Sequence, residues 1–265
     1  MKIVCLKGGL GNQMFEYCRF RDLMESGNDK VYLFYDRRRL KQHNGLRLSD
    51  CFELELPSCP WGIKLVVWGL KICRAVGVLK RLYDDEKPEA VLIDDYSQHR
   101  RFISNARRYF FFRQFLAELQ SGFVQMIRAV DYPVSVHVRR GDYLHPSNSI
   151  FGLCGVDYFQ QAIAYVRKKR PDARFFFFSD DMEWVRENLW MEDAVYVEHT
   201  ELMPDYVDLY LMTLCRGHII SNSTFSFWGA YLAVDGNGMK IYPRRWFRDP
   251  TWTSPPIFSE EWVGL

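Results

Sequence analysis

Val134-Ser-Val-His-Val-Arg-Arg-Gly-Asp-Tyr143 combines a β-strand pattern with a charged turn. Valines at 134, 136 and 138 alternate with polar residues, which is the two-residue period of a strand. The opposite face of this strand carries His137 and Arg139 side by side at its carboxyl end. Gly141 allows a sharp turn there, and Asp142 is placed to hold a guanidinium group.

This strand end has two interpretations. In an open α/β sheet, ligands bind beyond the carboxyl ends of the strands. A planar, permanently charged guanidinium at that position is suited to a phosphate. The same residues also fit a structural Arg–Asp pair that closes a turn, and the stretch by itself leaves both interpretations open.

The beginning of the chain has the pattern of a strand, a glycine-rich turn, a helix and a second strand. Met1–Leu6 and Val31–Tyr35 are the expected strands, and apolar residues from Gln13 to Glu25 recur at helical spacing. The turn Lys7-Gly-Gly-Leu-Gly-Asn12 offers backbone N–H groups to a ligand. It lacks the Lys-Ser/Thr pair of a P-loop, and an ordinary tight turn would have the same sequence.

Two more strand ends carry polar groups in the second half of the chain. Phe175–Phe178 is a continuous apolar run, typical of a buried parallel strand, and it ends in Ser179-Asp-Asp181. The two acids fit a metal site, a helix N-cap, or acceptors for a base or ribose. His218–Ile220 precedes Ser221-Asn-Ser-Thr224 and an apolar helix that runs to Val234. Hydroxyls and a helix N-terminus therefore meet at one point and predict an anion site.

Two long segments are predicted to be helical, and a short last strand is expected at Lys240–Tyr242. Trp61–Leu82 is apolar but contains four cations within about a third of a helical wheel. These are Lys64, Lys71, Arg74 and Arg81. A membrane span needs about 20 nearly uncharged residues, so this is a basic amphipathic helix, either packed on the core or in contact with a membrane surface. Ile103–Val130 is expected to be largely helical.

The composition excludes several classes of protein. An apolar content of 48% is typical of a globular chain, and a net charge of +2 argues against a nucleic-acid-binding protein. The seven cysteines are scattered without a C-x-x-C pair, which favours reduced thiols over disulfides or a zinc site. The apolar run Ile3–Leu6 is too short for the core of a secretory signal. We therefore expect a cytoplasmic protein.

Together these elements predict two α/β halves that divide near residue 130. Candidate ligand features at 139, 180 and 223–224 lie at strand ends of the second half, and the glycine-rich turn belongs to the first. Two Rossmann-like domains, 1–130 and 131–265, that face each other across a cleft would bring these features together.

Several motifs, taken in order, resemble glycosyltransferase family 11, the α-1,2-fucosyltransferases. They are Gly8-Gly-Leu-Gly-Asn-Gln-Met-Phe15, His43-Asn-Gly45, His137-Val-Arg-Arg-Gly-Asp142, Phe178-Ser-Asp-Asp181 and Asn222-Ser-Thr-Phe-Ser-Phe-Trp-Gly-Ala230. The resemblance spans nearly the whole chain and implies a GT-B fold, GDP-fucose as the donor, inversion at the fucose C1 and no metal. It also implies a galactose-containing glycan as the acceptor, usually through the 2-OH of a β-galactoside. At Phe227 the chain departs from its relatives, which usually have a second Trp.

The resemblance implies a role for each matching residue. Arg139 would bind the β-phosphate of the donor, and His137 would line the same pocket; with Asp142 they are the catalytic candidates. The other donor-binding candidates are Asp180 at the guanosine, Ser223, Thr224 and Phe225 at phosphate and base, and Gly11 and Asn12 in a loop that closes over the donor. His43 and Asn44 are candidates for binding the acceptor. The second half would thus bind GDP-fucose, and the first would face the acceptor.

The residues support this chemistry independently of the resemblance. Departure of a nucleoside diphosphate builds negative charge on its β-phosphate. Arg139 and the helix start near Thr224 could stabilise that charge without a cation. Metal-dependent transferases of the other common fold use Asp-x-Asp, and the sequence contains no such triplet.

Three questions stay open in the sequence. The acceptor could be a different hydroxyl, such as one on a protein, and a catalytically inactive sugar-nucleotide or glycan-binding protein could keep the same motifs. The general base is not identified, because the acids at 36, 94, 95 and 142 and His43 are all candidates. The basic helix would allow peripheral contact with the cytoplasmic face of the membrane, where lipid-linked glycans reside.

Overall fold

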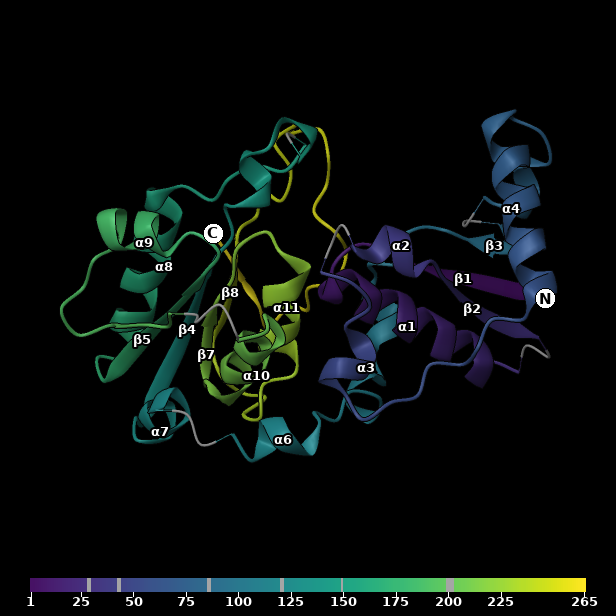
Figure 1. Cartoon of the computed structure of the whole chain (residues 1–265). Coiled ribbons are helices and arrows are strands. Elements are labelled where there is room, and N and C mark those ends of the chain that lie inside the picture. Colours follow the sequence, from purple (N-terminus) through teal and green to yellow (C-terminus); the bar gives the residue numbers. More distant parts are fainter. Residues whose placement is uncertain (28–29, 42–43, 85–86, 120–121, 149, 199–202) are drawn as a thin grey trace. The chain divides into compact units, whose positions relative to one another are not determined.

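The computed structural model describes residues 1–27, 30–41, 44–84, 87–119, 122–148, 150–198 and 203–265. These residues form two compact units, Met1–Arg113 and Gln114–Leu265. Each unit has its own parallel β-sheet with helices packed against it (Figure 1). The α/β class predicted from the sequence is confirmed. The division expected near residue 130 falls inside the second unit, between α7 (Gly122–Arg128) and β4 (Tyr132–Val138).

The sheet of the first unit has the strand order β2-β1-β3, with parallel pairs throughout. Its strands are β1 (Lys2–Leu6), β2 (Val31–Tyr35) and β3 (Leu92–Ile93). Its helices are α1 (Leu10–Glu25), α2 (Arg37–Leu40), α3 (Leu48–Cys51), α4 (Trp61–Ala75) and α5 (Arg100–Ile103), with 3₁₀ turns at Lys80–Leu82 and Ala106–Arg108. The predicted strand–helix–strand unit is confirmed, and β1 is apolar and buried from Ile3 to Leu6 because it is the central strand.

The first helix begins earlier than its apolar spacing predicts. Gly9 precedes it, and the N–H groups of Asn12 and Gln13 both donate to Gly9 O at 3.0 Å. Gly11 and Asn12 therefore lie in the first turn of α1 rather than in a loop. The sharp change of direction between strand and helix occurs at Gly8, whose φ of 70° favours glycine.

The predicted helix over Trp61–Leu82 is confirmed as far as Ala75 and is wrong in its last third. α4 ends at Ala75, because Gly77 and Leu79 adopt positive φ angles of 76° and 56° that an α-helix cannot contain. Arg81 therefore lies in the following 3₁₀ turn and not on the face of α4. None of the described helices is long and apolar enough to cross a membrane.

The largely helical segment expected over Ile103–Val130 is also wrong. α6 (Gln114–Ala117) and α7 are short, and an extended segment precedes them. In that segment the rings of Phe110 and Phe112 pack on Phe52, with centroid distances of 4.8 and 5.0 Å. Phe112 also forms an isolated antiparallel bridge with Phe52. Burial of these aromatic side chains overrides the local helical spacing.

The sheet of the second unit has the strand order β6-β5-β4-β7-β8-β9, and all neighbouring pairs are parallel. The strands that join β4 are β5 (Ala173–Ser179), β6 (Val195–Tyr196), β7 (Gly217–Ile219), β8 (Lys240–Tyr242) and β9 (Val263–Gly264). The longer helices are α8 (Val156–Lys169), α9 (Met182–Asn188), α10 (Tyr206–Leu214) and α11 (Thr224–Tyr231), and 3₁₀ turns occur at Asp142–Leu144 and Pro146–Asn148. β4 lies inside the sheet, and its valines pack with Phe175 and Phe177 in the core.

Candidate functional site

The segments that follow β4, β5 and β7 meet at one edge of the second sheet. These three strands are neighbours and run in the same direction (Figure 1). Their carboxyl ends therefore bring together Arg139, Asp180 and Ser221–Thr224, as the strand pattern predicts. This edge is the position at which open α/β sheets bind ligands.

Two carboxylates hold the guanidinium of Arg139. Its Nε donates to Asp142 Oδ1 at 2.9 Å, and its Nη1 lies 3.1 Å from Asp180 Oδ2. Burial opposes the charge of this side chain, but the two carboxylates outweigh burial and raise the pKa of Arg139 above its ordinary value. The side chain remains 34% exposed, so the fixed fork is accessible to a ligand.

Asp180 also fixes the turn after β4. Its Oδ1 accepts the backbone N–H of Arg140 at 2.9 Å. Gly141 passes so close that a Cβ there would lie 2.8 Å from Asp180 Oδ2. A side chain at position 141 would displace the carboxylate, so the glycine of this motif is required by close packing. Both oxygens of Asp180 are thus bonded within the protein.

Arg140 is a residue of this edge that the sequence did not single out. Its Nε donates to Asp181 Oδ2 at 3.1 Å, and its guanidinium lies over the ring of Trp184 at 4.0 Å. Asp181 Oδ1 in turn accepts the N–H of Trp184 at 3.2 Å as the N-cap of α9. Of the roles considered for the acids after β5, capping is therefore confirmed for Asp181. The sequence feature that could have identified Arg140 is the second arginine of the Arg139-Arg140 pair.

His137 is buried behind Arg139 and is neutral. Its Nδ1 lies 3.0 Å from Ser221 Oγ, and its ring packs against Phe225 at 5.8 Å. Burial, with the charge of Arg139 added, lowers the pKa of His137 to about 3. The imidazole therefore contributes a hydrogen bond and a ring surface to the site rather than a charge.

The N-terminus of α11 completes the edge. Ser223 precedes the helix in an extended conformation and makes no side-chain capping bond, and the first turn contains no acidic residue. Thr224 and Phe225 are partly exposed there. The first-turn N–H groups of a helix have no carbonyl partners within the helix, and they carry a positive partial charge. This end of α11 can therefore attract an anion.

Asn222 has a structural role within the same motif. It is buried, and its Nδ2 donates to the carbonyl oxygens of Gly152 and Trp246, at 2.7 Å each. These two hydrogen bonds connect the chain at Gly152 and at Trp246 to the end of β7.

The first unit places Gly11 and Asn12 at the start of α1. Gly11 is buried, and Asn12 Oδ1 accepts a hydrogen bond from Gln98 Nε2 at 3.0 Å. Gln13, which the sequence did not single out, donates from Nε2 to the carbonyls of Gly8 and Gly45 at 3.0 and 2.9 Å. Gln13 could have been identified from the sequence, because it lies inside the motif Gly8–Phe15. Asn44 is exposed with a φ of 64°; His43 lies outside the described residues.

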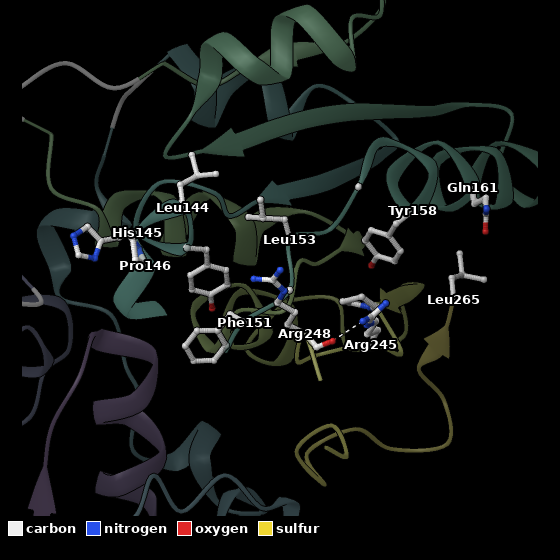
Figure 2. Close-up of a pocket in the computed structure, with 14 residues that line it drawn as sticks. Leu144, His145, Pro146, Phe151, Leu153, Tyr158, Gln161, Arg245, Arg248 and Leu265 are labelled. Atoms are coloured by element: carbon white, nitrogen blue, oxygen red, sulfur yellow. Dashed lines mark hydrogen bonds between the residues drawn. The ribbon is translucent and has the colours of Figure 1, made fainter. Parts of the chain in front are cut away.

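A cavity of about 830 Å³ lies within the second unit, and nothing in the sequence pattern predicted it. Figure 2 shows Phe151, Tyr158, Arg245 and Arg248 around it. Tyr143 links the cavity to the edge: its ring stacks on Phe151 at 4.7 Å, and its hydroxyl donates to Asn222 O at 2.9 Å. Within the described ranges, no group of three or more His, Cys, Asp or Glu side chains is arranged to hold a metal ion.

The chain is similar to known glycosyltransferases. The family model described as Glycosyl transferase family 11 matches residues 100–265. An alpha-1,2-colitosyltransferase of Escherichia coli is 30% identical over 98% of this chain and 97% of its own length. The galactoside 2-alpha-L-fucosyltransferase SEC1 of Bos taurus is 27% identical over 98% of this chain and 72% of its own length.

The fold is also similar to a solved structure. The crystal structure of NodZ alpha-1,6-fucosyltransferase soaked with GDP-fucose matches with a TM-score of 0.52 and 15% identity. The match covers 88% of this chain and 92% of that one. With two parallel α/β sheets, the fold is GT-B-like, as the sequence predicted.

Proposed function

Because the chain belongs to glycosyltransferase family 11, we propose that it is an inverting α-1,2-fucosyltransferase. It moves L-fucose from GDP-fucose to the 2-hydroxyl of a β-galactoside in a glycan. The observation that carries this proposal is the guanidinium of Arg139, fixed by two carboxylates at a strand end beside a helix N-terminus.

The reaction needs stabilisation of a leaving diphosphate. The acceptor hydroxyl gives its proton to a general base, and its oxygen forms a bond to the fucose C1. The bond from C1 to the β-phosphate oxygen breaks, and the electron pair of that bond leaves with GDP. Negative charge therefore grows on the β-phosphate in the transition state. Arg139 can take two phosphate oxygens with its planar fork, and the first-turn N–H groups of α11 add partial positive charge. These groups require no metal ion for this step.

Each remaining candidate has a role that its surroundings support. His137 is buried and neutral, so it positions Ser221 and Phe225 and lines the nucleotide pocket. Ser223 and Thr224 hold phosphate oxygens, and Phe225 packs on the base. Asp142 and Asp180 both orient Arg139. A contact from Asp180 to the guanosine, which the resemblance implies, is the alternative role for this residue.

The first unit provides the acceptor side in this proposal. Gly11 and Asn12, at the start of α1, are the donor-binding candidates of this unit, and His43 and Asn44 are its acceptor-binding candidates. Asn12 is held by Gln98 from the segment after β3, so the two strand ends of this unit are linked.

A second candidate differs in the transferred sugar. The E. coli relative is named an alpha-1,2-colitosyltransferase, and it shares 30% identity over nearly the full chain. The same phosphate-binding groups would serve a colitosyl donor equally, because they do not touch the sugar. Comparing turnover of the two donors by the purified protein separates these candidates.

The direct test is GDP release from GDP-fucose with and without a free β-galactoside, in the presence of a chelator. We expect acceptor-dependent release, no loss with chelator, and an α-1,2 linkage in the product by NMR. GDP binding without turnover on any glycan would support a binding protein. Turnover only on a protein acceptor would show that the acceptor is a protein hydroxyl and not a β-galactoside. Activity that requires manganese or magnesium would contradict the metal-independent mechanism.

A further inference from the structure

We propose that α4 and the cavity beside it dock the first unit on an anionic lipid bilayer. α4 is apolar on two opposite faces. One face buries Ile63, Val67 and Leu70 in the core of the unit. The other presents large apolar side chains to solvent, 43% to 73% exposed: Trp61, Leu65, Trp68 and Ile72.

This exposed apolar face continues past the end of α4. Val76, Val78 and Leu79 are each about half exposed or more. Contiguous apolar surface of this kind marks an interaction site. Its two indoles favour a membrane interface, where an amphipathic ring lies between headgroups and acyl chains.

The charge around this face has one sign. The segment 57–83 contains five cations, Lys64, Lys71, Arg74, Lys80 and Arg81, and no acid. Asp94 compensates only part of this charge. Its carboxylate lies 3.5 to 3.7 Å from the charged groups of Lys7, Lys71 and Arg74, so one anion is shared among three cations.

A cavity of about 640 Å³ adjoins the same helix. α2 contributes Arg37 and Arg38 to its lining, and α4 contributes Lys64, Trp68 and Lys71. Among the described residues that line it, Asp36 carries the one carboxylate, and its Oδ1 already accepts the N–H of Arg38 at 2.9 Å. A cavity with four cations beside exposed indoles is suited to the phosphate of a lipid headgroup whose acyl chains meet the apolar face.

The charge distribution favours a bilayer over a second copy of the chain. A two-fold interface would place the same cationic surface of both copies together, which is unfavourable. A soluble anion would use the cavity but would leave the indoles in water. Only an anionic surface with an apolar interior satisfies both features.

The test is co-sedimentation of the full chain with vesicles of phosphatidylcholine alone or with added phosphatidylglycerol. We expect binding only to the anionic vesicles, decreasing as salt is raised. Trp61→Ala with Trp68→Ala should weaken binding by at least about tenfold, because the interfacial apolar area is lost. Trp190→Ala with Trp252→Ala is the matched control, since these indoles are 63% and 52% exposed in the second unit.

A second pair of variants tests whether binding depends on the cations at the cavity or only on the net charge of the chain. Lys64→Glu with Arg38→Glu should reduce binding by at least about tenfold, because each charge near an anionic surface contributes about fivefold. Lys168→Glu with Lys169→Glu, on exposed positions of α8, makes the same change of net charge and should have little effect. None of these readouts depends on fucosyl transfer, so they can fail independently of the proposed function.

Two results would overturn the proposal. One is equal binding to neutral and anionic vesicles. Equal loss of vesicle binding in the variants and in their controls would count in the same way. The other is a dimer in lipid-free solution that Trp61→Ala with Trp68→Ala converts to a monomer, which would assign the face to a second copy of the chain.

Discussion

Asp180 lies 3.1 Å from the guanidinium of Arg139, although the two residues come from the ends of different strands. Both side chains are about one-third exposed or slightly less, so the pair contributes at most about 1 kcal/mol to folding. Its main consequence is orientation: the end of β5 sets the direction of a cation that extends from β4. Phosphate binding by Arg139 should therefore depend on a residue of the neighbouring strand.

Asp180→Asn tests this dependence. The amide can still accept the N–H of Arg140, but it loses the charge that holds Arg139. We expect affinity for GDP to fall about three- to fivefold, because the pair is partly screened by solvent. Affinity for GMP should change less, since GMP lacks the β-phosphate. Calorimetric titration with both nucleotides measures the two effects.

Asp193→Asn is the control for Asp180→Asn. Asp193 pairs with Arg167 at 2.7 Å on the surface of the same unit, and its loss should leave both affinities unchanged. An equal decrease in GDP and GMP affinity in Asp180→Asn would instead indicate that Asp180 acts directly on the guanosine.

Two buried histidines should make the fold sensitive to acid. Burial lowers the pKa of His137 and of His218 to about 3, whereas the unfolded chain titrates near 6.5. The unfolded state therefore binds more protons between these values, and the free energy of unfolding decreases as the pH falls below about 6.5. The slope is at most about 1.4 kcal/mol per pH unit for each group.

Urea unfolding between neutral pH and pH 5 measures this slope. Imidazole NMR signals that stay in the neutral form at pH 5 would identify the two buried rings. A free energy of unfolding that stays constant over this range, or imidazole shifts near pH 6.5 for both rings, would contradict the expected burial effect.

The sequence predicted the strands better than the long helical segments. The expected strands at Val31–Tyr35 and Lys240–Tyr242 match β2 and β8, because each is a short, largely apolar run bounded by turn residues. The aromatic run before α6 has helical spacing, but its side chains pack on Phe52, which is distant in sequence. β9 is two residues long and is defined by pairing with β8, so no local periodicity signals it.

The site shows the same division between local and distant information. The pairing of Asp142 with Arg139 was readable, because the two residues are three positions apart. The requirement for Gly141 was not, because it comes from the close approach of Asp180 on the neighbouring strand. The bond from Asp180 to Arg140 joins neighbouring strands whose pairing the sequence does not specify. The cavity beside Tyr143 depends on segments that converge only after folding.

The structure distinguishes three of the acids that the sequence left open as general base. Asp94 forms ion pairs with three cations and Asp142 forms one with Arg139, so both carboxylates are already engaged within the protein. Asp95 is exposed, and its Oδ1 accepts hydrogen bonds from Ser97 N and Oγ at 3.1 and 2.6 Å. These bonds orient the carboxylate without an adjacent ion pair among the described residues.

We therefore expect Asp95→Asn to lower kcat about 10²- to 10⁴-fold while GDP affinity is kept. Asp94→Asn is the neighbouring control and should lower Tm rather than kcat, because it releases three cations. Steady-state kinetics and thermal melts of both variants provide the comparison. Near-normal turnover in Asp95→Asn would exclude it as the base.

Arg139 itself gives the sharpest distinction between catalysis and structure. If it stabilises charge on the leaving diphosphate, its effect is larger in the transition state than in donor binding. Arg139→Ala should then lower kcat on the order of 10²-fold or more, and Arg139→Lys should be folded but strongly impaired, because it keeps the charge and loses the fork. The same substitutions at Arg167, whose pair with Asp193 is exposed, should leave kcat unchanged.

If the Arg139–Asp142 pair only closes the turn, Arg139→Ala would lower Tm while activity per folded molecule is kept. Measuring Tm and kcat on the four variants decides between the two, and a well-folded Arg139→Ala with near-normal turnover would end the catalytic assignment.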